Sequence, residues 1–168
     1  MNEFIQRNRG LFKFYHLVTS ILGWVLTGIT PFLAILSIYS KPDRGDSEAN
    51  TYLLLLIIRN FFIYYLCLGL ILIGLARFIK YLYTEESQQS WSLRHFDKFL
   101  YIYALLLIAG RIVDFLRPGL FSNGVSSNEL TTLSTAIVFT LAYILIIIGL
   151  SHIISKILPV IGESKTLV

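Results

Sequence analysis

Residues 130–154 read "LTTLSTAIVFTLAYILIIIGLSHII", and this stretch contains no Asp, Glu, Lys or Arg. About 20 apolar helical residues are enough to span the roughly 30 Å hydrocarbon core of a bilayer. Three more runs have this length and character, and they cover residues 17–39, 52–76 and 97–116. The sequence therefore predicts an all-α membrane protein, a four-helix transmembrane bundle that forms one domain over residues 1–168.

The overall composition agrees with lipid as the solvent of this chain. Of its 168 residues, 55% are hydrophobic and 14% are charged, and the mean hydropathy is +0.70. A soluble domain of this length needs much more polar surface. The net charge of +4 is spread over short loops, with no basic stripe in a polar domain, so nucleic acid is not expected as a partner. We expect membrane lipids and other membrane protein subunits, or further copies of the chain, as partners.

The segment "QRNRGLFKF", residues 6–14, precedes the first apolar run. That run is longer than the apolar part of a signal peptide and is not followed by a small-residue cleavage motif, so we expect a retained helix. Cys67 is the single cysteine and lies within the second run. A lone cysteine offers neither a disulfide framework nor a Cys-based metal site. We expect it to be a small packing residue.

Basic residues in short loops indicate which side of the membrane is cytoplasmic. One face of the predicted bundle carries most of them, namely Arg7, Arg9, Lys13, Arg77, Lys80, Arg94, Lys98, Lys156 and Lys165. The opposite face carries Lys41, Arg44 and Arg117. This asymmetry predicts that both termini are cytoplasmic. We expect a bacterial plasma membrane, with an organelle membrane as the alternative.

The two halves of the chain resemble each other weakly. "IGLARFIKYL", residues 73–82, is similar to "IGLSHIISKIL", residues 148–158. A duplication would give two tandem helical hairpins related by an axis along the membrane normal. The alternative is that both segments have the ordinary composition of a cytoplasmic helix end, and the sequence alone does not separate the two.

Charged residues interrupt the apolar stretch "YIYALLLIAGRIVDFLRP", residues 101–118. A charge at the centre of a spanning helix costs about 2.5–3.5 kcal/mol and less near the interface. At 1.5 Å per residue, Arg111 lies roughly 8–10 Å from the outer end of its helix and Arg59 at about 10 Å. Asp114 is the acid of this layer, and it shares a helical face with Arg111 and Arg117.

Asp114 can pair with Arg111 on its own helix or with Arg59 across helices, and either pairing lowers the cost of the charges. Two arginines and one aspartate leave a surplus of positive charge. Three interpretations stay open: a staple between helices whose charges reach the outer surface, a contact with a neighbouring subunit or lipid phosphate, and a substrate or ion site. Polar side chains expected near this layer are Asn60, Thr131, Ser134 and Thr135.

His16 and His152 fall at the same predicted membrane level, on the first and fourth helices. Two histidines facing each other across a four-helix bundle can ligate a b-type haem. The alternative is that both are interfacial residues that bond to headgroups, carbonyls or water. We find no His/Glu/Asp cluster with metal-ligand spacing, so no other metal site is expected.

Motifs for nucleophilic, nucleotide-dependent or zinc-dependent catalysis are absent from the sequence, so we do not expect an enzyme. The expected function is that of a non-catalytic accessory or structural subunit of a larger membrane complex, without a cofactor but with bound lipids. The second hypothesis is a small oligomeric transporter or channel that uses the layer of Arg59, Arg111 and Asp114. The third is an electron carrier with haem b held by His16 and His152.

Overall fold

The structure is a computed structural model, and it describes residues 3–40, 47–84, 90–116 and 127–166. Nearly all of these residues are helical, and no strand occurs among them. The all-α prediction is therefore confirmed. Leu favours a helix because its side chain loses little freedom there. The Ile-rich parts of the same apolar runs are helical because a helix satisfies its own backbone hydrogen bonds, which lipid cannot do.

The described chain contains two short helices and four long helical rods. The short helices are α1 (Glu3–Arg7) and α5 (Trp91–Arg94). The rods are α2 (Arg9–Tyr39); α3 (Ser47–Ile58), the π-helix η1 (Arg59–Leu66) and α4 (Cys67–Tyr83) in continuous succession; α6 (Phe96–Phe115); and α7 (Ser127–Thr166).

Three of these rods are long and apolar enough to cross a membrane: α2, the continuous α3–η1–α4 rod, and α7. The fourth predicted span, 97–116, corresponds to α6, which has 20 residues. Four of them are charged, Asp97, Lys98, Arg111 and Asp114. These charges separate α6 from the other three by composition, so a bundle of four membrane-crossing helices remains a prediction.

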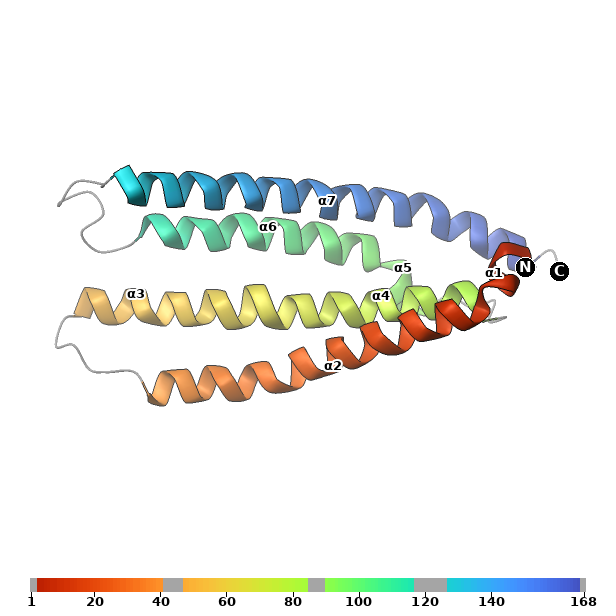
Figure 1. The fold of residues 1–168 in the computed structure, drawn as a ribbon, viewed down its shortest axis with the longest axis horizontal. Helices are drawn as coiled ribbons and strands as arrows, with labels where there is room; N and C mark the ends of the chain where they lie inside the picture. Colours follow the sequence, from red (N-terminus) through yellow and green to blue (C-terminus); the bar gives the residue numbers. More distant parts are fainter. Residues whose placement is uncertain (1–2, 41–46, 85–89, 117–126, 167–168) are drawn as a thin grey trace.

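Three rods continue beyond the predicted apolar runs, and the longest extensions lie at the end of the molecule that holds the chain ends (Figure 1). α2 begins at Arg9 rather than near residue 17, α4 continues to Tyr83, and α7 continues through Pro159 to Thr166. Apolar length reports the thickness of the hydrocarbon core, whereas a helix can continue beyond that core where packing against its neighbours stabilises it. The sequence prediction therefore located the helices but made these ends too short.

The rods form two helical hairpins that lie side by side (Figure 1). α2 packs mainly against α4, and α6 packs mainly against α7. Contacts of α6 with η1 and α4 join the two pairs. The N-terminal end of α1 and the C-terminal end of α7 lie at the same end of the molecule (Figure 1). This arrangement has the form of two tandem hairpins, while a duplication that produced it remains a prediction.

Two glycines allow α2 and α4 to approach closely. A Cβ on Gly23 would lie 2.9 Å from the Gly69 carbonyl oxygen, and a Cβ on Gly69 would lie 2.6 Å from Thr27 Oγ1. Thr27 donates its hydroxyl hydrogen bond to the Gly23 carbonyl at 2.8 Å, so this polar group is satisfied within α2. Close packing around small residues is a common way to associate helices in lipid.

Glycines elsewhere in the helices differ in their surroundings. A Cβ on Gly74 would meet the Phe96 ring, so this glycine also lies at a helix contact. At Gly28 and Gly149 a Cβ would have no neighbouring atom within 4 Å. These two glycines therefore face outward from their helices and make no close helix contact within the described chain.

The core lies mainly between α4, α6 and α7. Its most deeply buried residues are Leu100 of α6 and Ile154 and Ser151 of α7. Ser151 donates to the backbone carbonyl of Asp97 at 2.9 Å, so the one fully buried hydroxyl in this group joins α7 to the start of α6. A buried hydroxyl without such a partner would be costly.

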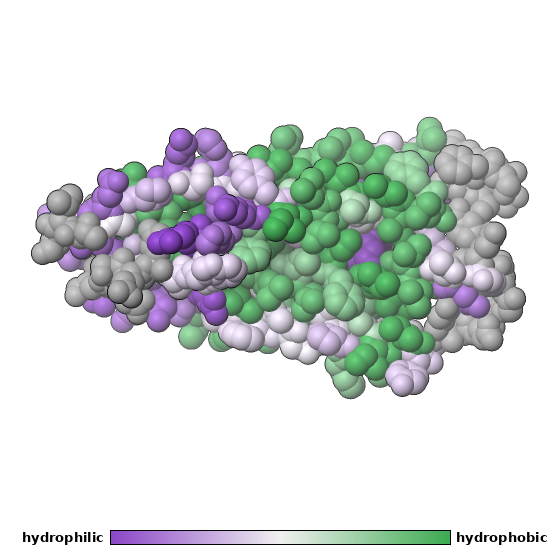
Figure 2. Space-filling view, turned by 180° about the vertical axis from the view of Figure 1, so that it is seen from behind, coloured by the Kyte–Doolittle hydropathy of each residue, from purple (hydrophilic) through white to green (hydrophobic). Residues whose placement is uncertain are grey.

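The outer surface forms a broad apolar band, with hydrophilic residues concentrated at the end that holds the chain ends (Figure 2). Phe139 of α7 is 71% exposed, and many Leu and Ile side chains of α2 and α7 are exposed as well. An apolar surface of this extent marks contact with lipid or with other proteins. A small hydrophilic patch interrupts the band (Figure 2).

Candidate functional site

A cluster of charged residues joins three of the four rods, and we call Arg59, Arg111, Asp114 and Thr140 the charge cluster. Arg59 is the first residue of η1, Arg111 and Asp114 lie on α6, and Thr140 lies on α7. Arg111 and Asp114 are three residues apart, which places them on one face of α6. That face points toward η1 and α7, as the contacts of its side chains show.

Asp114 binds both arginines, one with each carboxylate oxygen. Arg59 Nη1 donates to Asp114 Oδ1 across the helix interface. Arg111 Nη1 donates to Asp114 Oδ2 at 3.0 Å within α6. The sequence offered these pairings as alternatives, and the structure contains both. One carboxylate therefore stabilises two guanidinium groups, as expected where charges leave water.

The remaining contacts of the arginines extend the cluster. Arg59 Nε donates to Asn60 Oδ1 at 3.1 Å, and Arg111 Nε donates to Thr140 Oγ1 at 2.6 Å. Thr140 is buried and donates its own hydroxyl to the Ala136 carbonyl at 2.8 Å. Thr140 thus accepts from α6 while it donates within α7, and both hydrogen-bonding roles of its hydroxyl are used.

Tyr64 of η1 presents its ring to both arginines. The guanidinium carbons of Arg59 and Arg111 lie 5.6 and 5.9 Å from the ring centroid, within cation–π range. The Tyr64 hydroxyl oxygen is buried and has no hydrogen-bond partner within the described part of the chain. The aromatic face therefore gives both cations a further favourable contact.

Gly110 and the π-helix bring Arg59 close to α6. A Cβ at Gly110 would lie 3.3 Å from Arg59 Cγ, so the glycine leaves room for the arginine stem. η1 spans Arg59–Leu66, and π-helical segments often occur at functional sites because the wider turn redirects side chains. The hydrophobic pattern gave no indication of this segment, since an apolar run looks the same in an α-helix and in a π-helix.

The structure separates the other residues predicted near this layer. Asn60 belongs to it, through Arg59. Ser134 and Thr135 instead donate to the Thr131 carbonyl of their own helix, at 2.9 and 2.8 Å. Thr140 is the α7 residue that accepts the hydrogen bond of Arg111. Arg111 lies level with a part of α7 farther from its first residue, Ser127, than Ser134 and Thr135 are. Arg117, predicted as the fourth charge, lies outside the described residues.

The two predicted haem ligands make separate contacts. His16 Nδ1 lies 3.3 Å from the Tyr83 hydroxyl, and the two rings meet edge to face. His152 lies on an exposed face of α7. No contact in the described chain joins the two histidines, and haem binding remains a prediction that an absorption spectrum would test. The described residues contain no group of three His, Cys, Asp or Glu side chains that could hold a metal ion.

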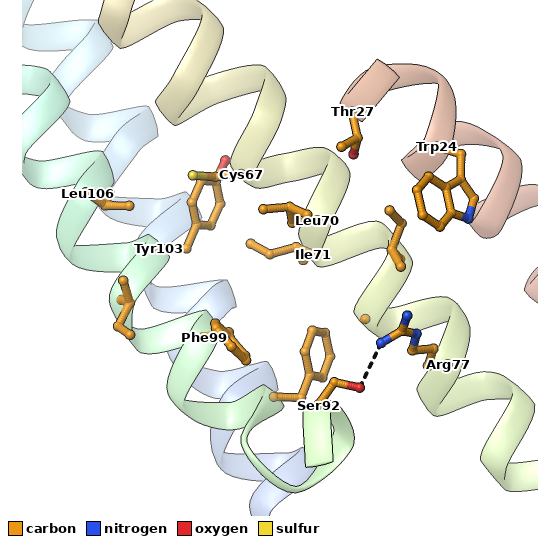
Figure 3. A pocket seen from close by; sticks show the side chains of 14 residues that line it. Trp24, Thr27, Cys67, Leu70, Ile71, Arg77, Ser92, Phe99, Tyr103 and Leu106 are labelled. Carbon is orange, nitrogen blue, oxygen red and sulfur yellow. Dashed lines mark hydrogen bonds between the residues drawn. The ribbon is translucent and has the colours of Figure 1, made fainter. Parts of the chain in front are cut away.

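Cys67 is half-buried and packs against the core between α4 and α6. It also lines one end of an apolar groove of about 320 Å³ between α4 and α6, to which α2 contributes Trp24 and Thr27. Arg77 and Ser92 lie at the other end of this groove (Figure 3). The sequence alone does not reveal this groove, because it depends on which faces of α4 and α6 meet.

The described part of the chain is almost entirely helical and contains three helices long and apolar enough to cross a membrane, and partly buried charges connect the rods. Comparison with protein-family models, curated proteins and solved structures finds no match for this chain. Its function is therefore argued from the charge cluster and from the surface.

Proposed function

We propose that this protein is a non-catalytic subunit of a larger membrane assembly, with four transmembrane helices and both termini in the cytoplasm. The assembly consists of other membrane proteins or of further copies of the chain. The Arg59–Asp114 pair holds η1 to α6, and Arg111 carries the charge that this pair leaves uncompensated.

The observation that carries the proposal is the charge balance of the cluster. Two arginines share one aspartate, and no second acidic side chain contacts them within the described residues. The side chain of Arg111 is 28% exposed, compared with 12% for Arg59. A surplus charge at an apolar surface is unfavourable in lipid, so an acidic side chain or phosphate of a neighbour would stabilise it.

The surface and the interior support a subunit better than a solute pathway. The outer faces of α2 and α7 are apolar and carry exposed aromatic and aliphatic side chains, which suit contact with lipid and with neighbouring helices. The groove between α4 and α6 is lined mainly by apolar side chains. A transport path requires polar groups distributed along it, whereas the centres of α6 and α7 consist mainly of Leu, Ile and Ala.

The proposed orientation is supported by charge and by the common position of the chain ends. Nine of the basic residues counted in the loops fall on the predicted cytoplasmic side and three on the other. The first and last helices end together at the hydrophilic end of the molecule (Figures 1 and 2). Cysteine accessibility at Asn8 and at Ser164, measured in intact cells and in inverted vesicles, tests this orientation.

The experiment that tests the proposal is extraction in a mild detergent through a C-terminal tag, followed by measurement of composition and mass. We expect other membrane proteins, or additional copies of the chain, in a fixed ratio. If only copies of the chain are present, the transporter or channel function moves ahead and the flux measurement described below separates it from a structural oligomer. A chain that is extracted alone, as a 19.2 kDa monomer in its detergent micelle, would contradict the proposal.

One observation favours a second function, that of a small transporter or channel. The charge cluster lies beside a π-helix, an arrangement that recurs at functional sites. A transporter would require Arg111 for flux, so liposomes with wild type and with Arg111→Leu should then differ in solute uptake. Equal uptake by the two, at equal reconstitution, would remove this alternative.

A further inference from the structure

The groove between α4 and α6 has an apolar floor that is open to the surroundings. α4 contributes Leu70 and Ile71, and α6 contributes Phe99, Ile102 and Leu106 (Figure 3). Leu70 and Ile102 are 54% and 52% exposed, so the chain itself does not cover them. With a volume of about 320 Å³, the groove is within the range of about 300–1,000 Å³ that is usual for small-molecule sites.

The length of the groove matches one leaflet of a bilayer. Along α4 it extends from Cys67 to Arg77, and ten helical residues correspond to about 15 Å. The hydrocarbon core of a bilayer is about 30 Å thick, so one leaflet accounts for about half of that. A groove that begins near the middle of the α3–η1–α4 rod and ends at Arg77, the charge that follows the predicted apolar run, has the dimensions of a single acyl chain.

A cation lies where the headgroup of such a lipid would be. Arg77 Nη1 donates to Ser92 Oγ at 2.9 Å, at the α5 end of the groove (Figure 3). This bond uses one of the five guanidinium N–H donors. Arg77 is exposed and has no acidic partner among the described residues. Guanidinium groups bind phosphate oxygens with two parallel hydrogen bonds, which makes arginine well suited to an anionic headgroup.

The aromatic residue next to this end agrees with a position at the membrane interface. Trp91 precedes Ser92 and is 70% exposed, and the centroid of its ring lies 4.8 Å from that of His95, with the two rings tilted by 35°. Tryptophan is enriched at the level of lipid headgroups. A groove that is apolar along its length and cationic at its interfacial end is complementary to an anionic phospholipid, whose acyl chain is apolar and whose headgroup is negative.

We propose that this groove binds one anionic phospholipid of the leaflet at the α5 end, with an acyl chain along α4 and α6 and its phosphate on Arg77 and Ser92. The inference requires that the chain is embedded in a membrane. It does not depend on the subunit role, because the lipid contacts belong to this chain alone.

The test is native mass spectrometry of the protein released from nanodiscs that contain equal amounts of phosphatidylglycerol and phosphatidylcholine of the same chain length. We expect about tenfold more retained phosphatidylglycerol than phosphatidylcholine. Both lipids offer a phosphate to Arg77, but only the phosphatidylglycerol headgroup carries a net negative charge, because choline neutralises the phosphate of phosphatidylcholine. Arg77→Gln should reduce this preference to near equality. Lys156→Gln removes a charge from an exposed position on α7 and should leave the preference unchanged.

A second pair of variants tests the groove itself. Leu70→Trp places a large ring in the groove and should lower the retention of both lipids, whereas Leu105→Trp, on a 65% exposed position outside the groove, should not. Glycerol 3-phosphate added at millimolar concentration should not displace the lipid, because it lacks the acyl chain.

Three results would overturn the proposal. The first is equal retention of the two lipids by the wild type. The second is unchanged retention in both Arg77→Gln and Leu70→Trp. The third is a photo-crosslinker at position 99 that labels a polypeptide instead of lipid. Each of these results can be obtained whether the chain is extracted alone or with partners. Failure of the lipid proposal is therefore distinguishable from failure of the subunit proposal, which the mass of the extracted complex tests.

Discussion

Arg59 and Asp114 form an ion pair between η1 and α6 although they are 55 residues apart in the sequence. Asp114 also accepts from Arg111, which in turn donates to Thr140 of α7. One carboxylate is thereby the common partner of two arginines, and together with the Arg111–Thr140 hydrogen bond it connects three rods. Substitutions in this network and in the packing around it should therefore differ sharply in their effects.

Asp114→Leu should be more damaging than Arg111→Leu. Loss of the carboxylate leaves two arginines without an anionic partner, whereas loss of Arg111 leaves the Arg59–Asp114 pair intact. Removing one partner of a fully buried pair costs about 3–5 kcal/mol, and the loss here should be smaller because the side chains of Arg59 and Asp114 are 12% and 21% exposed. The yield of monodisperse protein after detergent extraction measures the difference, and equal yields of the two variants would disprove the pairing argument.

Thr140→Val should destabilise the contact between α6 and α7. The change keeps the shape of the side chain but removes the oxygen that accepts from Arg111 Nε, and an unsatisfied donor costs about 1–3 kcal/mol. Thermal unfolding in detergent measures this loss. Thr135→Val is the matched control, because the Thr135 hydroxyl bonds only within α7. If the control lowers the melting temperature equally, the interhelical bond contributes nothing.

Gly69→Ala should disrupt the contact of α2 with α4. Its Cβ would lie 2.6 Å from Thr27 Oγ1 and 3.0 Å from the Thr27 backbone nitrogen, so the helices must separate. Overpacking of this kind costs about 1–3 kcal/mol. Crosslinking between cysteines introduced in α2 and α4 reports the separation. Gly28→Ala on α2 meets open space and should leave both the crosslink and the melting temperature unchanged; a similar loss in that variant would refute the assigned crossing point.

Lys165→Met should loosen the end of α4. Lys165 Nζ donates to the carbonyls of Tyr81 and Thr84, the latter at 2.8 Å, and lies 3.7 Å from the centroid of the Tyr81 ring. A cation at a helix C-terminus contributes about 0.3–1 kcal/mol and binds carbonyls that lack helical partners. Hydrogen exchange of the amides near Thr84 should become faster, while Lys156→Met should have no such effect. Unchanged exchange in Lys165→Met would show that the end of α4 is held by other contacts.

The positions of the helices could be predicted because a helix long and apolar enough to cross a membrane appears in the sequence as a continuous run of apolar residues. The spacing of three residues between Arg111 and Asp114 predicted that they share one face of α6. The partner across helices could be offered only as an alternative, since helix rotation is set by packing. For the same reason the sequence named Ser134 and Thr135 where the structure uses Thr140.

Other features were not accessible because they depend on how two surfaces meet. Gly23 and Gly28 look equivalent in the sequence, but only Gly23 faces α4. The π-helix at Arg59 adds no hydrophobic residue and removes none, so no pattern of polarity reveals it. The groove beside Arg77 appears only when α4 and α6 are placed side by side.

The mass of the extracted complex, with and without the charge of Arg111, decides whether this arginine offers a surplus charge to a neighbouring subunit. We expect the wild type and Arg9→Leu, a change at an exposed position outside the cluster, both to be larger than one chain. Arg111→Leu should be folded but reduced to a single chain. A folded Arg111→Leu protein that retains the full complex would contradict the proposed role of Arg111.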